Sequence, residues 1–199
     1  RYISISRGSS FGTKRGNPSI IRKNILSKEN LEDNANKSGR FPKKKHKRGM
    51  GMHTETFFLN MDDGAEIFLR TWAEVNDPQG VLQLAHGMAE HTARYEAFAR
   101  FCNDHGFIVV AGDHRGHGKT GENSGLMGYF ADQDGFDRVV QDLANINQWV
   151  QKEFSNLPRI LMGHSLGSFL TRRYLQLYGG TIHGAILMGS GGNPGFAGK

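Results

Sequence analysis

The pentapeptide Gly-His-Ser-Leu-Gly at residues 163–167 contains a serine whose spacing could support nucleophilic chemistry. A short apolar strand is predicted directly before it, over 159–163, and the apolar spacing predicts a helix directly after it, over 166–178. G-x-S-x-G between a strand and a helix is typical of a nucleophile elbow, a turn so tight that it needs glycines on both sides. We therefore predict that Ser165 is a nucleophile at a helix N-terminus, where the helix dipole favours developing negative charge. This context disfavours the alternative, a glycine-rich turn with an incidental serine.

A second motif, His-Gly-Met-Ala-Glu-His at residues 86–91, directly follows the strand predicted over 81–85. An oxyanion hole needs one backbone N–H from the residue after the nucleophile and another from a loop after an earlier strand. By position, Leu166 and Met88 supply these two amides, so neither side chain needs to be polar. We interpret His86 as a structural residue that braces the loop through hydrogen bonds, and not as the catalytic base.

The sequence Asp-His-Arg-Gly-His-Gly at residues 113–118 places two histidines beside a carboxylate, which suggests a metal site. Its glycines and the strand predicted before it place the segment on a loop, and no further Cys/His cluster completes a closed zinc site. We therefore expect no metal and no other cofactor, and we interpret the segment as a loop that supports the active site. Glu90 and His91 are expected to brace the oxyanion loop, and Asp134 and Asp137 lie at a predicted helix N-terminus.

Strands and helices alternate around these motifs. The Asp-Gly pair at 63–64, between two apolar runs, predicts a β-hairpin. We predict strands over 54–60, 65–71, 81–85, 107–111, 159–163 and 182–188, and helices over 95–102, 136–154 and 166–178. This order predicts an α/β fold with a mostly parallel sheet and an opening hairpin.

The basic charge of the chain is concentrated near its N-terminus. Residues 1–50 contain 14 Lys and Arg against 3 Asp and Glu, while the rest of the chain is mildly acidic. Residues 1–49 have no apolar period, so we predict a disordered basic tail followed by a folded domain over 50–199. The basic run at 43–48 fits a solvated charge block better than a nuclear-localisation or polyanion-binding patch, and we expect no nucleic-acid partner. We further hypothesise that translation starts at Met50 or Met52, so that the tail is not native coding sequence.

Cysteine content and hydropathy narrow the class of protein further. The single cysteine, Cys102, excludes an internal disulfide framework and a C-x-x-C zinc site, and it fits a reducing compartment. No apolar run approaches the roughly 18 residues of a membrane-spanning helix. We expect a cytoplasmic protein and leave open peripheral contact with a membrane.

Taken together, the three motifs make residues 51–199 resemble an α/β-hydrolase of the monoacylglycerol lipase and lysophospholipase group, which is also classed with the serine aminopeptidase S33 domain. The matching segments are residues 86–91 with Arg94 and Tyr95, residues 113–118, and residues 163–167. The resemblance implies an α/β-hydrolase fold, with Ser165 as nucleophile and the Met88 and Leu166 amides as the oxyanion hole. In this group a helical cap follows the strand predicted here over 182–188, and the acid and histidine of the catalytic triad come later still. We therefore expect an N-terminal part of the fold, truncated before the cap and the last strands, without the triad acid and base.

The histidines of the chain do not offer an obvious base. In α/β-hydrolases the triad residues follow the order serine, acid, histidine along the chain. Of the nine histidines only His183 follows Ser165, and its place at the start of a strand indicates a structural role. Since a serine without a base stays protonated and is a poor nucleophile, we expect this chain alone to be nearly inactive.

The favoured function is a serine hydrolase that cleaves lipid esters, such as a monoacylglycerol or a lysophospholipid, through an acyl-enzyme on Ser165. Two alternatives stay open: an S33-type aminopeptidase on the same fold, and a non-catalytic protein that binds polyanions through its basic tail. An epoxide or haloalkane hydrolase is disfavoured, because those enzymes carry an aspartate where Ser165 stands. The expected partner is a small lipid ester, with membrane contact, if any, through the cap.

Overall fold

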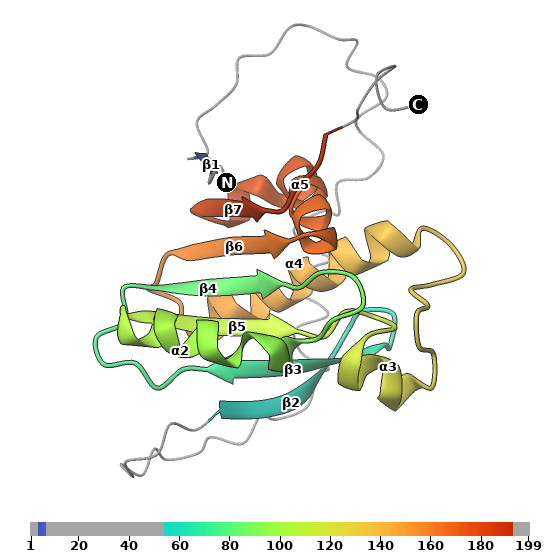
Figure 1. Ribbon diagram of the computed structural model, residues 1–199, viewed down its shortest axis with the longest axis horizontal. Helices are drawn as coiled ribbons and strands as arrows, with labels where there is room; N and C mark the ends of the chain where they lie inside the picture. The colour runs from blue at the N-terminus through green and yellow to red at the C-terminus, as the bar shows by residue number, and fades with distance from the viewer. Residues whose placement is uncertain (1–3, 7–53, 193–199) are drawn as a thin grey trace, which may run out of the picture. The chain divides into compact units, whose positions relative to one another are not determined.

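The computed structural model describes residues 4–6 and 54–192, which form a seven-stranded sheet with helices on both faces (Figure 1). The strand order is β1-β7-β6-β4-β5-β3-β2. The strands are β1 (Ser4–Ser6), β2 (Thr54–Asn60), β3 (Glu66–Trp72), β4 (Gly80–Ala85), β5 (Phe107–Gly112), β6 (Arg159–His164) and β7 (Gly184–Met188). The four strands β5, β4, β6 and β7 are parallel, β1 and β3 pair antiparallel with β7 and β5, and β2 pairs antiparallel with β3. The predicted α/β fold with an opening hairpin is confirmed.

The β2–β3 hairpin turns where the Asp-Gly pair predicted it. The Met61 N–H donates to the Ala65 carbonyl at 2.8 Å, and the Gly64 N–H donates to the Met61 carbonyl at 3.1 Å. Gly64 has a φ of +84°, a conformation that glycine adopts without the steric cost of a side chain. The turn fixes the register in which Phe58 lies opposite Phe68.

Two layers of helices cover the sheet. The helices are α2 (Glu96–Asp104), α3 (Gly118–Ser124), α4 (Gly135–Glu153) and α5 (Leu166–Tyr178), with short 3-10 helices η3 (Thr92–Tyr95) and η4 (Gly179–Thr181). Figure 1 shows α2 in front of the sheet and α4 behind it. Within the described ranges, no helix is long and apolar enough to cross a membrane.

The central strand β4 shows how the core is divided between the two faces. All six of its residues are buried. Leu82 and Leu84 pack with the buried side chains of α2, whereas Val81 and Ala85 face the buried side chains of α4 and α5. Because successive side chains of a strand point to opposite faces, a sheet covered on both sides buries the whole strand, and its one polar side chain, Gln83, is satisfied by hydrogen bonds to the Leu143 carbonyl and from Asn147.

Besides the two short 3-10 helices, one α-helix and one strand were not predicted from the sequence. Helix α3 has no apolar residues at helical spacing, so its sequence gives no amphipathic signal. Strand β1 lies inside the segment that we expected to be disordered, and it pairs with β7 so that Ile5 lies opposite Ile186. The expectation of disorder therefore does not hold for Ser4–Ser6. The rest of residues 1–49, with Met50 and Met52, lies outside the described residues, so those hypotheses stay predictions.

A buried ion pair fixes the loop after β5 to helix α4. Arg115 donates from Nε and Nη2 to the two carboxylate oxygens of Asp142, both at 2.7 Å, and it also donates to Asp63. Asp142 is only 3% exposed. The loop-ordering role that we expected for residues 113–118 therefore has a physical basis.

Replacing Asp142 by alanine should lower the free energy of unfolding by about 3 kcal/mol, because it leaves a partly buried guanidinium with only one of its two carboxylates. The matched control is Asp137→Ala on the same helix, which removes an exposed pair with Arg173 and should cost less than about 1 kcal/mol. Urea unfolding of the three proteins measures both values. Equal midpoints for the two variants would contradict the prediction.

Candidate active site

Ser165 lies in the sharp turn between β6 and α5 (Figure 1). Its backbone has φ 50° and ψ −116°, a strained conformation for a residue with a side chain. The turn is held by a hydrogen bond from the Ser165 N–H to the Met188 carbonyl at 2.9 Å, which joins it to the end of β7. The described geometry is that of a nucleophile elbow.

The glycines on either side of the turn are required by close backbone packing. A Cβ added to Gly163 would overlap the carbonyl group of Gly167 and the hydroxyl of Thr171. A Cβ added to Gly167 would overlap the Ala85 carbonyl and lie 2.8 Å from the His86 carbonyl oxygen. Helix α5 thus begins in direct contact with the loop that follows β4.

The loop after β4 brings Gly87, the residue before Met88, to the elbow. A Cβ on Gly87 would lie 3.2 Å from Ser165 Cβ, so this loop runs directly beside the serine. Leu166 is the first residue of α5, and its N–H is one of the amides that a helix start leaves without an intrahelical partner. In the described part of the chain, neither the Met88 nor the Leu166 amide donates to another protein group. Both amides are available to an oxyanion, although their catalytic roles stay predictions.

Glu90 ties this loop to the elbow strand. Its Oε1 accepts hydrogen bonds from the Gly87 N–H, from the Tyr95 hydroxyl at 2.7 Å and from His164 Nδ1 at 3.0 Å. Burial by itself would raise the pKa of Glu90, but the hydrogen bonds from His164, Tyr95 and Gly87 lower the pKa to about 2. Glu90 is therefore a carboxylate with three donors, as the expected bracing role requires.

Beneath the loop lie three histidines whose side chains are almost fully buried: His86, His114 and His117. The His86 and His114 rings have centroids only 4.0 Å apart. Burial lowers the pKa of His86 to about 4 and holds the pKa of His114 well below its usual value, so both rings are neutral near pH 7. Among the described residues, no group of His, Cys, Asp and Glu side chains has the arrangement of a metal site.

The absence of a triad base within this chain stays a prediction, and the described histidines can be compared with it. No hydrogen bond joins Ser165 Oγ to an imidazole within residues 54–192. His183 lies at the amino end of β7, where its Nδ1 accepts a hydrogen bond from the Arg159 N–H at 3.1 Å. Ser165 follows the carboxyl end of β6, so the two residues lie at opposite ends of the parallel strands. His46 and His53 lie outside the described residues.

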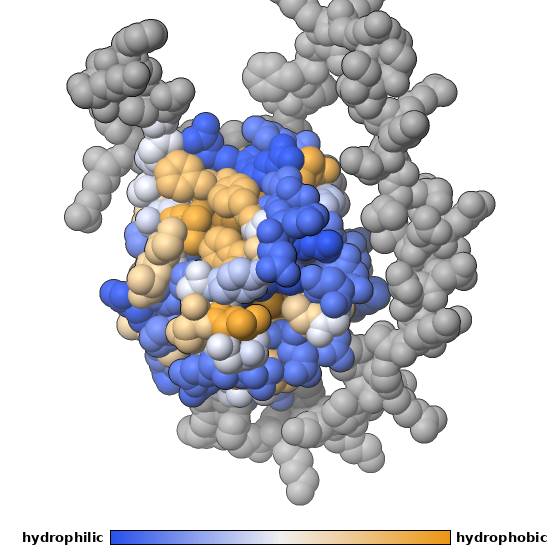
Figure 2. Space-filling model, turned by 90° about the vertical axis from the view of Figure 1, so that its right-hand side faces the viewer, coloured by the Kyte–Doolittle hydropathy of each residue, from blue (hydrophilic) through white to orange (hydrophobic). Residues whose placement is uncertain are grey.

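Exposed apolar side chains flank the serine on the same edge of the sheet. Met88 follows β4, Phe169 lies in the first turns of α5 and Met188 ends β7, and they are 64%, 40% and 43% exposed. Figure 2 shows hydrophobic side chains gathered on the face at the carboxyl ends of the parallel strands. An apolar group bound beside Ser165 would find apolar partners on this face.

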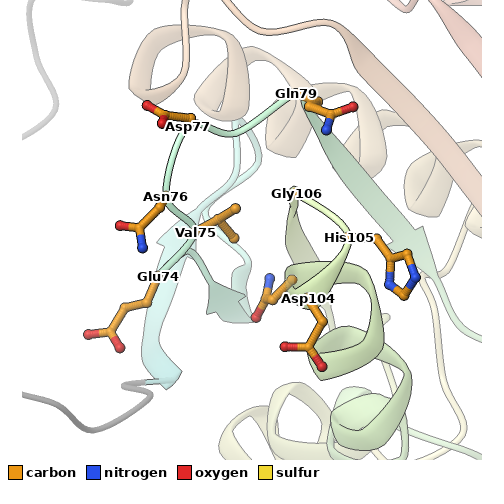
Figure 3. A pocket seen from close by; sticks show the side chains of 9 residues that line it. Glu74, Val75, Asn76, Asp77, Gln79, Asp104, His105 and Gly106 are labelled. Carbon is orange, nitrogen blue, oxygen red and sulfur yellow. The ribbon is translucent and has the colours of Figure 1, made fainter.

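A hollow of about 720 Å³ lies elsewhere, at the amino ends of β4 and β5 (Figure 3). Its lining residues are Glu74, Val75, Asn76, Asp77, Gln79, Asn103, Asp104, His105 and Gly106. Figure 3 shows that the carboxylates among them do not converge on one point. Ligands of α/β sheets bind at the carboxyl ends of the strands, so we assign this hollow no part in the chemistry.

The sequence did not identify Tyr95 and His164 as hydrogen-bond partners of Glu90. Tyr95 and His164 are both hydrogen-bonded to Glu90, and His164 lies 74 residues from Glu90 in the chain. No local pattern predicts such a contact, because it depends on β4 and β6 being neighbours in the sheet.

The sheet order, the elbow and the loop after β4 together define an α/β-hydrolase fold. Residues 76–195 match the family described as serine aminopeptidase, S33, and the chain belongs to this family.

Characterised relatives and solved structures agree with this assignment. The chain is 36% identical over 126 residues to the monoacylglycerol lipase of Mycolicibacterium smegmatis, an alignment that covers 63% of this chain and 43% of the relative. It is 34% identical over 106 residues to the human monoglyceride lipase, covering 53% of this chain and 33% of the relative. A thermostable carboxyl esterase from Bacillus coagulans superposes with a TM-score of 0.63 at 30% identity, covering 68% of this chain and 44% of the esterase. The chain therefore spans less than half the length of these relatives.

Proposed function

We propose that this chain carries the nucleophile and the oxyanion hole of a serine hydrolase that cleaves carboxylic esters with an apolar acyl group, of the monoacylglycerol or lysophospholipid type. The observation that supports this most is Ser165 on its strained turn, beside two backbone amides that have no acceptor among the described residues. The relatives named as monoacylglycerol lipases and as an esterase, and the apolar side chains around the serine, support an apolar ester as substrate.

In the proposed reaction, Ser165 Oγ gives up its proton to a base and attacks the ester carbonyl carbon. The negative charge that forms on the carbonyl oxygen is stabilised by the Met88 and Leu166 N–H groups. When the tetrahedral intermediate collapses, the bond from the carbonyl carbon to the leaving oxygen breaks, the protonated base gives its proton to that oxygen so that a neutral alcohol departs, and an acyl-enzyme remains on Ser165. Water attacks this acyl group, releases the carboxylic acid and restores the serine hydroxyl.

The S33 aminopeptidase alternative is less well supported by the described residues. A site that removes an N-terminal residue needs an anionic group for the substrate ammonium. Glu90 is the carboxylate beside the elbow, and its Oε1 already accepts from Gly87, Tyr95 and His164. Polyanion binding by residues 1–49 and membrane contact stay predictions.

The proposed nucleophile can be tested by covalent labelling. We expect an alkyl fluorophosphonate at pH 9, where hydroxide can take the serine proton, to add once to the chain and to modify Ser165. A dodecyl probe should react faster than a probe with a triethylene glycol chain, because apolar side chains surround the serine. Intact mass and peptide mapping measure both results.

The control variants are Ser165→Ala, which should abolish labelling, and Ser124→Ala, an exposed serine away from the elbow, which should leave it unchanged. Labelling that survives in Ser165→Ala would contradict the assignment. Faster reaction of the glycol probe would favour a polar substrate.

A further inference from the structure

We propose that His86 is the positioning residue that sets the direction of the Met88 amide in the oxyanion hole. This inference rests on the proposed function, because it concerns the same site. His86 is fully buried, and its two ring nitrogens are hydrogen-bonded to backbone groups of Gly87 and His114.

The hydrogen bonds of His86 select one tautomer of its ring. His86 Nδ1 lies 2.7 Å from the Gly87 carbonyl oxygen, which can only accept, so Nδ1 must carry the proton. His86 Nε2 accepts from the backbone N–H of His114 at 3.0 Å, so Nε2 must be unprotonated. Both ring nitrogens are satisfied only in the neutral Nδ1–H form.

The bond to the Gly87 carbonyl acts on Met88 through the peptide group that the two residues share. In a trans peptide the C=O of one residue and the N–H of the next lie in one plane and point in opposite directions. Because His86 holds the Gly87 carbonyl, the Met88 N–H points away from His86. The peptide on the other side of Gly87 is also held, because its N–H donates to Glu90. The orientation of the Met88 amide is thus set before a substrate arrives.

The surroundings of the ring keep it in this form. Its neighbours are the His114 and His117 rings, with centroids 4.0 and 5.4 Å away, and the Asp113 and Glu90 carboxylates on the adjoining loops. Burial outweighs the attraction of these carboxylates for a second proton and lowers the pKa of His86 to about 4. His114 Nε2 in turn donates to the His86 carbonyl at 3.1 Å, which locks the two loops together.

Two substitutions of His86 differ in whether they keep the hydrogen-bond donor to the Gly87 carbonyl. In His86→Asn the amide nitrogen can take the place of Nδ1 and still donate to Gly87, whereas the longer side chain of His86→Gln reaches the place of Nε2 and loses that donor. We expect His86→Gln to lower the maximal rate of fluorophosphonate labelling at pH 9 about 100-fold, with the half-saturating probe concentration unchanged. His86→Asn should stay within about 10-fold of the unsubstituted chain. The control His105→Asn alters an exposed histidine that also bonds a carbonyl, and it should have no effect.

The tautomer is measured directly on the unsubstituted chain by nitrogen-15 NMR of labelled histidine at pH 7, which does not depend on any variant folding. An Nε2–H tautomer at His86 would overturn the inference, and an Nδ1–H tautomer supports it. Labelling of His86→Gln at the unsubstituted rate, with Ser165→Ala unreactive, would overturn the inference and leave the proposed function standing. If the unsubstituted chain is not labelled at Ser165, the proposed function fails and this inference fails with it.

Discussion

A Gly167→Val variant should lose the elbow and lower the free energy of unfolding by more than about 4 kcal/mol. The added Cβ would overlap the Ala85 carbonyl and come close to the His86 carbonyl, both of which are backbone groups of a buried strand and its loop. Neither can move without breaking the pairing of β4 with β5 and β6. Overpacking of a site that cannot give way is among the costliest single substitutions.

Urea unfolding followed by circular dichroism measures this loss. Gly180→Val is the matched control, because a Cβ at Gly180 meets nothing within 4 Å. The control should unfold within about 1 kcal/mol of the unsubstituted chain. Similar midpoints for the two variants would show that helix α5 does not start in contact with the loop after β4.

The second large effect concerns ester turnover. We expect the 199-residue chain to hydrolyse p-nitrophenyl butyrate at pH 7 no more than about 10³–10⁴-fold faster than water. This is the rate enhancement that an oxyanion hole and substrate binding provide without a base. The reason is that no described imidazole is hydrogen-bonded to Ser165 Oγ. The one histidine that follows Ser165 in the sequence, His183, lies at the amino ends of the parallel strands, whereas Ser165 lies at their carboxyl ends.

Initial rates with purified monodisperse chain, compared with Ser165→Ala, test this expectation. Turnover far above that range which disappears in Ser165→Ala would mean that a base exists within the chain. Turnover that persists in Ser165→Ala would instead point to a contaminating esterase.

The elements that the sequence predicted are those with a strong local signal. Helices α4 and α5 were found because apolar residues recur at helical spacing, and β6 because a short apolar run ends in the G-x-S-x-G motif. The strand predicted over 182–188 starts two residues later, at Gly184, because Ile182 and His183 form the connection from η4, which ends at Thr181.

The site was predictable to the extent that it is local. Ser165 and Leu166 belong to one motif, and Met88 follows from the rule that links that motif to an earlier loop. The bonds of Glu90 to His164 and of His86 to His114 were not predictable, since each joins loops from different strands. Such contacts depend on the strand order, which short-range patterns do not encode.

The atoms that would contact the reacting carbonyl oxygen are main-chain atoms, and this has a consequence for how the protein can diversify. The side chains at positions 88 and 166 do not make the oxyanion hole, so substitutions there can reshape the substrate surface without touching the chemistry. Met88, with 64% of its surface exposed beside Ser165, is the position where such change is least constrained by packing. The positions that tolerate the least change are instead Gly163 and Gly167, where any side chain would overlap the backbone, and the buried His86. Under the proposed function, side chains such as Met88 would set substrate preference, whereas main-chain groups and the residues that hold them would set catalytic competence, so a change of specificity at position 88 need not pass through an inactive intermediate.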